Sequence, residues 1–547
     1  MKSNYLTTAI IVVLLGVTGE NANGEPPRKR FALKSDVISP TVQRIDLDAA
    51  TFNELNAGPT SRRLACPMPS GEIVDLDVDR FEVVGADCKF IEMTAHGAAP
   101  MIRPDVVLFR GKIANEPLSH VFLALGADGT GNGYVDRAGQ RFFIATNRDD
   151  AGRMAPGSLT IHPSPTIQDS PEPATFCGVD RSHDRRHTGA STRGGPVNNR
   201  GARMAKVAIE VDQEFVQLFP NAAAANSYVV TLVAATHDIY LRDLNLRLRL
   251  DFVRLWPVGG EPFDAGNLSG FANYWIDNES PSLFNYIHLY SGQRSMSYAG
   301  IAYVGGRCDL ESTYGISGFL NGTFPPAVGP PSLDNWDVIV PTHEMGHNSG
   351  TFHTHDGYDP TIDDCGNGVP SRGTIMSYCH THPGGVLNID MWMHRQVEDV
   401  IEEDAVFGDC VEYDCNGNGI ADDLDITNGA PDVNGDDIPD ACQDCNNNTI
   451  LDPVEIIGGA PDINNNDIPD SCEPDCNLNG TPDPYECDLD PAIDLDGDNT
   501  PDSCQPDCNG NSVPDFLDVR EGGGFADVDR NNVPDVCQDC DSNSVTD

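Results

Sequence analysis

One run of residues, "HEMGHNSGTFH" from His343 to His353, constrains this chain more than any other feature of its sequence. On a helix, residues four apart lie on one face, so His343 and His347 can point at a single metal ion. Gly350 tolerates a positive φ, which lets the chain turn sharply and return with His353. Three protein nitrogens and one open position are typical of a catalytic Zn²⁺ site. Glu344 stands beside the first histidine, where it can hold a water molecule at the ion.

The alternative interpretation is a group of surface histidines with an incidental glutamate. Five fixed positions in the template His-Glu-x-x-His-x-x-Gly-x-x-His argue against coincidence. The alternative also leaves unexplained the downstream segment "GTIMSYC", which contains Met376.

Together the two segments resemble the metzincin zinc metalloproteases, in which a methionine turn underlies the zinc site. Within that group the chain resembles the adamalysins (reprolysins) over roughly residues 203–410, through "MAKVAIEVDQEF", "HDIYLRDLNLRLRLDFVRLW", "AGIAYVGGRCD" and the histidine motif. The resemblance implies an α/β (α+β) catalytic domain with a twisted mixed sheet and an active-site helix. It also implies a zinc-dependent endopeptidase that acts on protein or peptide substrates.

The same resemblance suggests roles for individual residues. Met376 is the methionine of the turn, and Glu344 is the general base that takes a proton from water and returns it to the leaving amine. "AGIAYVGG" is the edge strand on which an extended peptide lies. Tyr378 is either an aid in the transition state or a packed tyrosine. His355, His380 and His382 are not expected to be ligands.

Cys177 lies in "PATFCGVD", which resembles the cysteine-switch segment of adamalysin propeptides. There a thiolate fills the fourth position on zinc and keeps the enzyme latent. An ordinary disulfide cysteine is the alternative. The resemblance therefore predicts a zymogen, activated by cleavage between Arg181 and Arg203.

Seventeen cysteines in an exported chain indicate disulfides, and the seven before Val411 are an odd number. Cys66–Cys88 and Cys365–Cys379 can pair, and Cys308–Cys410 is the closure that the resemblance implies. That scheme leaves Cys177 alone.

The predicted organisation has four parts. Residues 1–24 read as a secretory signal peptide, so a secreted protein is expected. Residues 25–200 read as a mainly β propeptide, with strand-like runs such as "DVVLFRGKIA", "HVFLALG" and "RFFIATN" before a polar basic linker. Residues 201–410 read as the catalytic domain and open with a strand, helix and strand. Residues 411–547 form an acidic tail. No other apolar run approaches the length of a membrane span.

The tail carries 35 acidic residues against two arginines, whereas the whole chain has a net charge of −50. Such a tail repels nucleic acid and anionic membrane surfaces and suits hard cations. The template Asp-x-[Asp/Asn]-x-[Asp/Asn]-x-x-x-Asp occurs in it nine times, starting at Asp414, Asp432, Asp444, Asp462, Asp475, Asp494, Asp507, Asp527 and Asp539.

These units resemble thrombospondin type 3 and dockerin-type repeats, which implies several Ca²⁺ ions in a stiff rod; solvated disorder is the alternative. Candidate calcium ligands in four units are Asp414, Asn416, Asn418, Asp422, Asp425, Asp444, Asn446, Asn448, Asp452, Glu455, Asp475, Asn477, Asn479, Asp483, Glu486, Asp507, Asn509, Asn511, Asp515 and Asp518. The sixth position, where calcium loops prefer glycine, holds Thr449, Asp467 or Ser512 in three units, which are expected to bind more weakly or to turn differently. Joining each cysteine at position 2 to position 11 of the next unit gives the pairs 415–442, 445–472, 476–504 and 508–537.

Two other classes of function remain open. The chain could be a non-enzymatic calcium-binding surface or matrix protein, or a docking module of the cellulosome type. Nine units exceed the single pair expected of a docking module, and the intact Glu344 with three histidines favours the enzyme. The tail is expected to space the enzyme or to attach it to a cell surface or matrix.

Overall fold

The computed structural model describes most of the chain between Arg30 and Val519. The described residues are 30–33, 35–39, 42–116, 119–137, 140–148, 154–163, 177–180, 202–324, 337–358, 361–368, 372–382, 385–407, 411–519, 534 and 537. The predicted signal peptide, the basic linker with its predicted cleavage region and Cys410 lie outside these residues. No described helix is long and apolar enough to cross a membrane.

The N-terminal part of the chain forms a ten-stranded sheet in the order β1-β4-β5-β8-β9-β10-β11-β12-β3-β2. Its strands are β1 Arg30–Ala32, β2 Ser35–Ser39, β3 Val42–Asp46, β4 Ser61–Pro67, β5 Ile73–Phe81, β8 Val106–Ile113, β9 His120–Gly126, β10 Gly131–Arg137, β11 Gln140–Arg148 and β12 Met154–Pro163. Neighbours pair antiparallel except β1 with β4. The three strand-like runs quoted from the sequence correspond to β8, β9 and β11, which confirms them.

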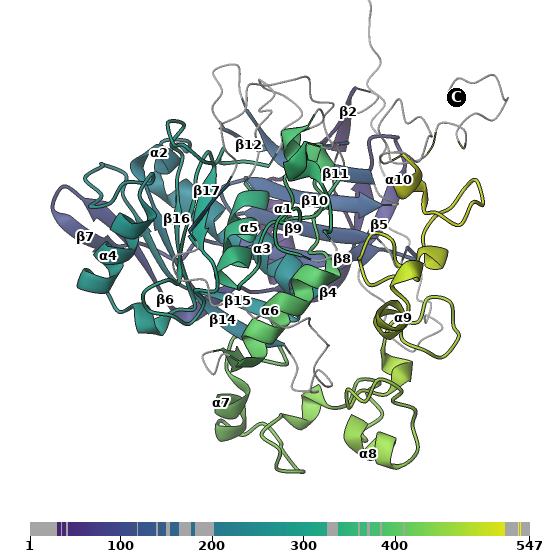
Figure 1. The fold of residues 1–547 in the computed structure, drawn as a ribbon. Helices are drawn as coiled ribbons and strands as arrows, with labels where there is room; N and C mark the ends of the chain where they lie inside the picture. Colours follow the sequence, from purple (N-terminus) through teal and green to yellow (C-terminus); the bar gives the residue numbers. More distant parts are fainter. Residues whose placement is uncertain are drawn as a thin grey trace, which may run out of the picture.

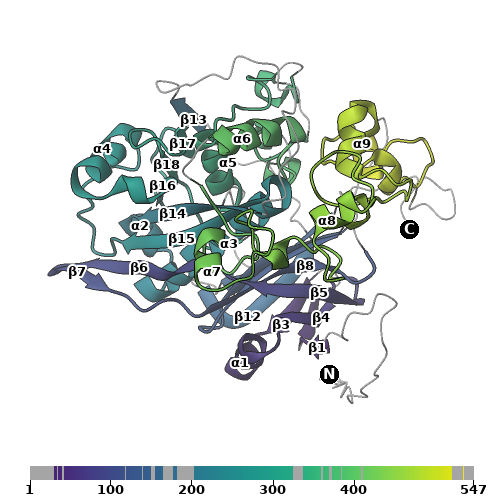
Figure 2. The ribbon, with the colours of Figure 1, turned by 90° about the horizontal axis from the view of Figure 1, so that it is seen from below.

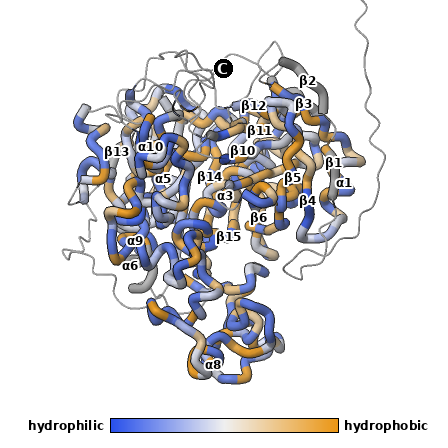
Figure 3. The backbone as a smooth tube through the Cα atoms, turned by 90° about the vertical axis from the view of Figure 1, so that its right-hand side faces the viewer, coloured by the Kyte–Doolittle hydropathy of each residue, from blue (hydrophilic) through white to orange (hydrophobic). Residues whose placement is uncertain are grey.

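Both faces of this sheet are covered. Because successive side chains along a strand point to opposite faces, each strand contributes residues to both cores. In β9, Val121, Leu123 and Leu125 join the core around helix α1 (Ala49–Ala57), whereas Phe122 and Ala124 join the core around helix α3 (Ala222–Leu244). Apolar residues recur along strands such as β5 (Figure 3). The sheet is therefore a middle layer, with α1 on one face and α3 on the other.

A second sheet of nine strands carries the order β13-β17-β18-β16-β14-β15-β6-β7, with β19 paired to β14. Its strands are β6 Val84–Thr94, β7 Gly97–Pro100, β13 Cys177–Asp180, β14 Arg203–Val211, β15 Leu246–Leu255, β16 Tyr286–Tyr290, β17 Gly300–Tyr303, β18 Tyr314–Ser317 and β19 Glu412–Tyr413. The predicted opening of strand, helix and strand is confirmed as β14-α3-β15, with the two strands parallel. β17 runs antiparallel to β18. The mixed α/β organisation predicted from the sequence is present.

Residues 84–100 belong to this second sheet although they precede the predicted catalytic domain. β6 pairs parallel with β15, and β7 folds back antiparallel on β6 (Figure 2). At the opposite end of the sheet, β13 pairs parallel with β17. Segments from the N-terminal part of the chain thus occupy both ends of the sheet.

The remaining helices surround the second sheet (Figure 1). They are α2 Gln213–Val216, α4 Leu268–Asn278, α5 Ile339–Asn348 and α6 Arg395–Phe407, with 3₁₀ turns at Pro281–Leu283, Cys365–Asn367, Cys379–Thr381 and Gly385–Asn388. α3 begins after Asn221, whose side chain accepts the Ala224 N–H, and ends at Asn245 with a left-handed φ of 48°. It packs on β15 on one side and on β8 and β9 on the other, so most of its residues are buried.

The repeat region consists of short helices and tight turns. Its helices are α7 Asp422–Thr427, α8 Asp452–Ile457, α9 Asp483–Leu489 and α10 Asp515–Asp518, with 3₁₀ turns at Asp440–Cys442, Asp470–Cys472, Pro491–Ile493 and Asp502–Cys504. The tail leaves the second sheet at α7 and returns beside α6 (Figure 1). Backbone carbonyls of Asp414 and Gly419 accept hydrogen bonds from Arg247 and Arg249 of β15, and the Gly497 carbonyl accepts one from the Arg395 N–H.

Five predicted disulfides are confirmed, namely 365–379, 415–442, 445–472, 476–504 and 508–537. Cys308 is also disulfide-bonded, while Cys410 lies outside the described residues. The predicted Cys66–Cys88 pair is wrong, because both are free thiols. Cys66 is buried in the core of the first sheet around α1, whereas Cys88 lies on β6 against the core of the second. Cys177 and Cys487 are also free.

The expectation that three repeat units turn differently is also wrong. Thr449, Asp467 and Ser512 have φ of 71°, 65° and 67°, close to the 80° of Gly419 and the 86° of Gly480. The turn is therefore the same, and the non-glycine residues hold a left-handed conformation that costs them energy.

Candidate metal centre

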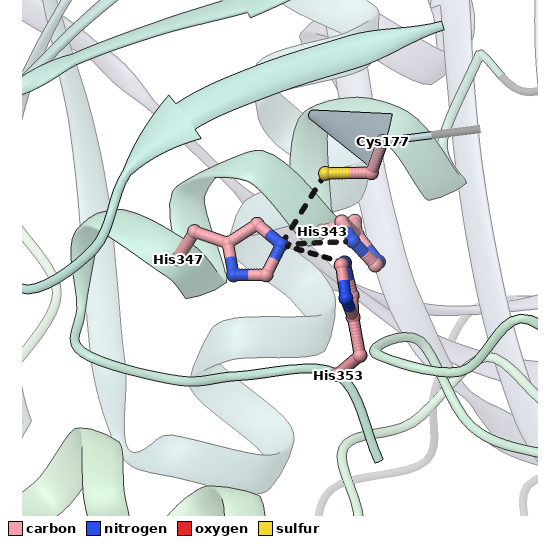
Figure 4. Close-up of side chains that lie close together, drawn as sticks. All are labelled: Cys177, His343, His347 and His353. Carbon is pink, nitrogen blue, oxygen red and sulfur yellow. Dashed lines mark hydrogen bonds between the residues drawn. The ribbon is translucent and has the colours of Figure 1, made fainter. Parts of the chain in front are cut away.

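Helix α5 and the turn after it bring the three motif histidines together. His343 and His347 lie one turn apart on α5, all of whose residues are buried. The helix ends at Asn348. Gly350, two residues later, has a φ of 94°, and its N–H donates to the His347 carbonyl at 2.9 Å. The chain then doubles back, so that His353 faces the same point as the other two rings (Figure 4). The left-handed glycine explains why the motif needs Gly350.

The ε nitrogens converge. His347 Nε2 lies 3.1 Å from His343 Nε2 and 3.2 Å from His353 Nε2. Nδ1 of His343 contacts the Ile375 carbonyl at 2.7 Å, and Nδ1 of His347 contacts the Thr351 carbonyl at 2.8 Å. Because carbonyls only accept, these Nδ1 atoms carry the protons and each Nε2 presents its lone pair.

This donor set fits a Zn²⁺ ion. Three convergent imidazoles, two of them oriented by backbone carbonyls, are ligands that zinc takes in catalytic sites. Burial, with a smaller contribution from the neighbouring His347, lowers the pKa of His343 well below its ordinary value, which keeps that ring neutral. The ligand atoms of the histidines and of Cys177 all lie within 4.8 Å of one another.

Glu344 is fully buried beside this cluster. Burial raises the pKa of its carboxyl well above the ordinary value. β17 approaches it closely at Gly300, where a Cβ atom would lie 2.1 Å from Glu344 Oε1. A glycine is therefore required at this position of the strand. The segment that contains Gly300 could be predicted from the sequence, but the role of the glycine could not, since nothing in the local pattern shows that β17 crosses Glu344.

Cys177 enters the site from β13. Its sulfur lies 3.4 Å from His347 Nε2 (Figure 4) and 3.6 Å from Glu344 Oε2. Cys177 is paired in register with Gly300, and its carbonyl accepts a hydrogen bond of 3.0 Å from the Tyr378 hydroxyl. The thiol thus occupies the open side of the three histidines.

Met376 and the segment that contains it lie beneath the cluster. Met376 is fully buried, and a Cβ at Gly346 would lie 2.7 Å from its sulfur. Its carbonyl accepts the Thr354 N–H at 3.1 Å, which ties the turn to the segment after His353. The Cys365–Cys379 disulfide closes the intervening loop.

Other aromatic residues support the cluster without joining it. The Tyr378 ring centroid is 4.3 Å from that of His353, and the His355 ring stacks parallel on His353 at 5.4 Å. His382 Nε2 contacts the Cys365 carbonyl at 2.9 Å. His355, His380 and His382 are absent from the group of convergent ligand atoms found among the described residues.

The predicted calcium residues come together within each of the four units. In the first unit, Asp414 accepts the N–H groups of Gly417 and Gly419, and the Asn416 and Asn418 side chains both reach Asp425 at 2.7 Å. The pattern recurs around Asp444, Asp475 and Asp507.

The ninth residue of the first unit is a buried carboxylate with one oxygen that no hydrogen bond satisfies. Asp422 is 4 % exposed; its Oδ1 accepts the Cys415 N–H, and its Oδ2 has no hydrogen-bond partner. Burial raises the pKa of Asp422 to about 6, with smaller contributions from the charges of Asp414 and Asp425. A buried carboxylate oxygen of this kind is suited to a hard cation.

The chain was compared with family models, solved structures and curated proteins. Residues 201–392 match the Reprolysin_5 family model, described as metallo-peptidase family M12. Among solved structures, the chain is similar to metalloproteinase-II from Bacteroides fragilis, with 12 % identity, 57 % of this chain and 88 % of that chain covered, and a TM-score of 0.33. A comparison with curated proteins gave no match. The segment similar to the metallopeptidases contains α5, the three histidines and Met376.

Proposed function

We propose that this metallopeptidase-like chain is a secreted zinc endopeptidase that is made in a latent form. The observation that carries the proposal is the convergence of three buried Nε2 atoms beside the Glu344 carboxylate. Similarity to metallo-peptidase family M12 over residues 201–392 supports it. When bound at these nitrogens, Zn²⁺ supplies a Lewis acid that activates water and polarises the scissile carbonyl.

The residues of the chain orient the metal ligands, transfer the proton and position the substrate. His343 and His347 are oriented by the Ile375 and Thr351 carbonyls, so their lone pairs stay aimed at one point. Glu344 accepts a proton from the attacking water and delivers it to the leaving amine nitrogen. An extended peptide pairs with β17, where β13 now lies, and places its scissile bond beside Glu344.

Cys177 accounts for latency. β13 covers the outer edge of β17 and its thiol fills the open side of the histidines, so neither water nor a substrate carbonyl can enter. Tyr378 holds the Cys177 carbonyl in this state. Once β13 leaves, the same hydroxyl is available to donate to substrate. Cleavage between Arg181 and Arg203 is the proposed trigger.

The enzyme proposal is tested with Glu344→Gln, which keeps the size of the side chain and removes the base. We expect the processed variant to lose casein hydrolysis by roughly 10²–10⁴-fold while its zinc content, measured by mass spectrometry, stays at one ion per chain. Asp264→Asn, on an exposed loop, serves as the matched control. Equal hydrolysis by Glu344→Gln would favour a non-enzymatic calcium-binding adhesion or matrix protein.

The tail is proposed to bind several Ca²⁺ ions and to space or anchor the enzyme outside the cell. The buried Oδ2 of Asp422 supports this proposal. Calorimetric titration should show Asp422→Asn losing one Ca²⁺ relative to the wild-type chain. Asp423→Asn, an exposed neighbour on α7, should keep the full number. Unchanged stoichiometry in both variants would remove the first unit from the calcium sites.

A further inference from the structure

The predicted propeptide contributes a strand to the catalytic sheet. β6 lies parallel to β15 with Phe252 opposite Lys89 and Leu255 opposite Glu92, and the Leu250 N–H donates to the Val83 carbonyl at 2.7 Å. Without β6, β15 would present a row of unpaired backbone groups at the sheet edge. The strand is therefore a structural part of the catalytic sheet as well as of the N-terminal segment.

A buried polar contact joins the first sheet to helix α3. Asp238 on α3 is 1 % exposed, and its Oδ2 lies 2.6 Å from His120 Nε2 of β9 and 3.0 Å from the Tyr134 hydroxyl of β10. Next to it, the Phe81 ring stacks on His237 with centroids 5.3 Å apart. All of these partners of α3 come from the N-terminal segment. The side of α3 that faces β8 and β9 is therefore covered by that segment.

A third contact joins β10 to Thr323 and Phe324. The side-chain Oδ1 of Asn132 on β10 accepts the Phe324 N–H at 2.9 Å and the Thr323 hydroxyl at 3.1 Å. The Phe122 ring lies 6.3 Å from that of Phe324. Side chains of both parts of the chain belong to one apolar core.

β13 makes far fewer contacts with the catalytic domain than residues 30–163 do. It has four residues, pairs along one strand only, and is fixed to the site by the Cys177 thiol and the Tyr378 hydroxyl. Burial of apolar area and backbone pairing set the strength of such contacts, and residues 30–163 make more of both with the second sheet and α3 than β13 does.

We propose that residues 30–163 stay bound after cleavage between Arg181 and Arg203, as a non-covalent subunit of the mature protein, while β13 alone leaves the cleft. The processing event is taken from the proposed function. The binding surface is α3 and the edge of β15 on which β6 pairs, and its partner is the N-terminal segment of the same chain. The mature catalytic unit is thus a two-fragment assembly.

The test uses the full chain carrying Glu344→Gln, so that self-cleavage plays no part. A recognition site for a sequence-specific protease replaces residues 188–194, and the cut chain is passed over a size-exclusion column. We expect two fragments on a denaturing gel that elute together at the mass of the uncut chain. Separate elution of the N-terminal fragment, or its digestion while the rest stays intact, overturns the proposal. The outcome does not depend on catalysis, so it stands apart from failure of the enzyme proposal.

A double variant locates the interface. His120→Ala with Tyr134→Phe removes both partners of the buried Asp238 carboxylate and should raise the dissociation constant of the cut fragments about tenfold or more in a dilution series. Arg103→Ala, which breaks an exposed pair with Glu82, is the control and should leave it unchanged. Equal dissociation constants for the two variants would overturn the assigned surface.

Discussion

The Cys177 sulfur lies 3.4 Å from Nε2 of His347, although 170 residues separate them in the chain. Two elements produce this proximity: β13 pairs with the edge strand β17, and α5 turns His347 toward that edge. The thiol is positioned by backbone pairing rather than by a local loop. The proposed latency therefore depends on one side chain at the end of a short strand.

Replacing Cys177 by alanine should raise the activity of the uncut chain. The variant keeps β13 but removes the atom that fills the open side of the histidines. We expect hydrolysis of a fluorogenic peptide by the intact chain to rise by about tenfold or more, equivalent to ~1.4 kcal/mol. Cys88→Ala changes a free thiol far from the site and should have no effect. No rise with Cys177→Ala would count against the switch.

Gly300→Ala should damage catalysis without removing the metal. The new Cβ would lie 2.1 Å from Glu344 Oε1, so the carboxylate must move, whereas the three histidines are held by α5 and its turn. We expect kcat of the processed enzyme to fall by roughly 10²-fold, with zinc content unchanged. Gly266→Ala, where the nearest atom lies at an ordinary 3.4 Å, is the control. Full activity in Gly300→Ala would show that Glu344 does not need its observed position.

Much of this site could be predicted from sequence because its information is local. The helical spacing of His343 and His347 and the turn at Gly350 act over a few residues. The repeat cysteines, 27 to 29 residues apart, are fixed by the regular period of the units. The pairing of Cys66 with Cys88 failed because the chain passes from β5, ending at Phe81, to β6, starting at Val84, and so changes sheets within three residues. A period of two shows that a strand is half-buried; it does not show which sheet the strand joins.

For the same reason, the roles of Gly300 and Asp238 could not be predicted from the sequence. Each matters through a residue far along the chain, Glu344 in one case and His120 in the other. Neither glycine nor aspartate stands out in its own segment. Contacts of this kind follow from the packing of complete elements, so only the folded chain reveals them.

Stability should fall in mild acid because of His237. Burial, reinforced by the charges of Arg247 and Arg110, lowers its pKa to about 3, while the unfolded side chain has the ordinary value of about 6.5. Between these values the unfolded state binds the proton and the folded state does not. The free energy of unfolding therefore decreases as pH falls from about 6.5 toward 3, by up to ~1.4 kcal/mol per pH unit.

Urea unfolding at pH 7 and pH 5 measures this effect. His237→Gln should lose less stability than the wild-type chain over that interval, although it is less stable at pH 7. His96→Gln, at an exposed turn, should follow the wild-type chain. An identical pH dependence in His237→Gln would assign the acid sensitivity to other groups.

Thr449→Gly should stabilise the repeat region. Thr449 has a φ of 71° at a turn position that Gly419 and Gly480 occupy in other units. A β-branched residue pays about 1–3 kcal/mol for this conformation, whereas glycine adopts it freely and loses only about 0.5–1 kcal/mol of additional chain entropy on folding. We therefore expect a net gain of ~1 kcal/mol, measured by thermal unfolding with Ca²⁺ present. Gly480→Thr should lose a similar amount, since nothing surrounds that Cβ and the cost comes from backbone strain alone. Destabilisation by Thr449→Gly would mean that the threonine side chain contributes contacts that outweigh the strain.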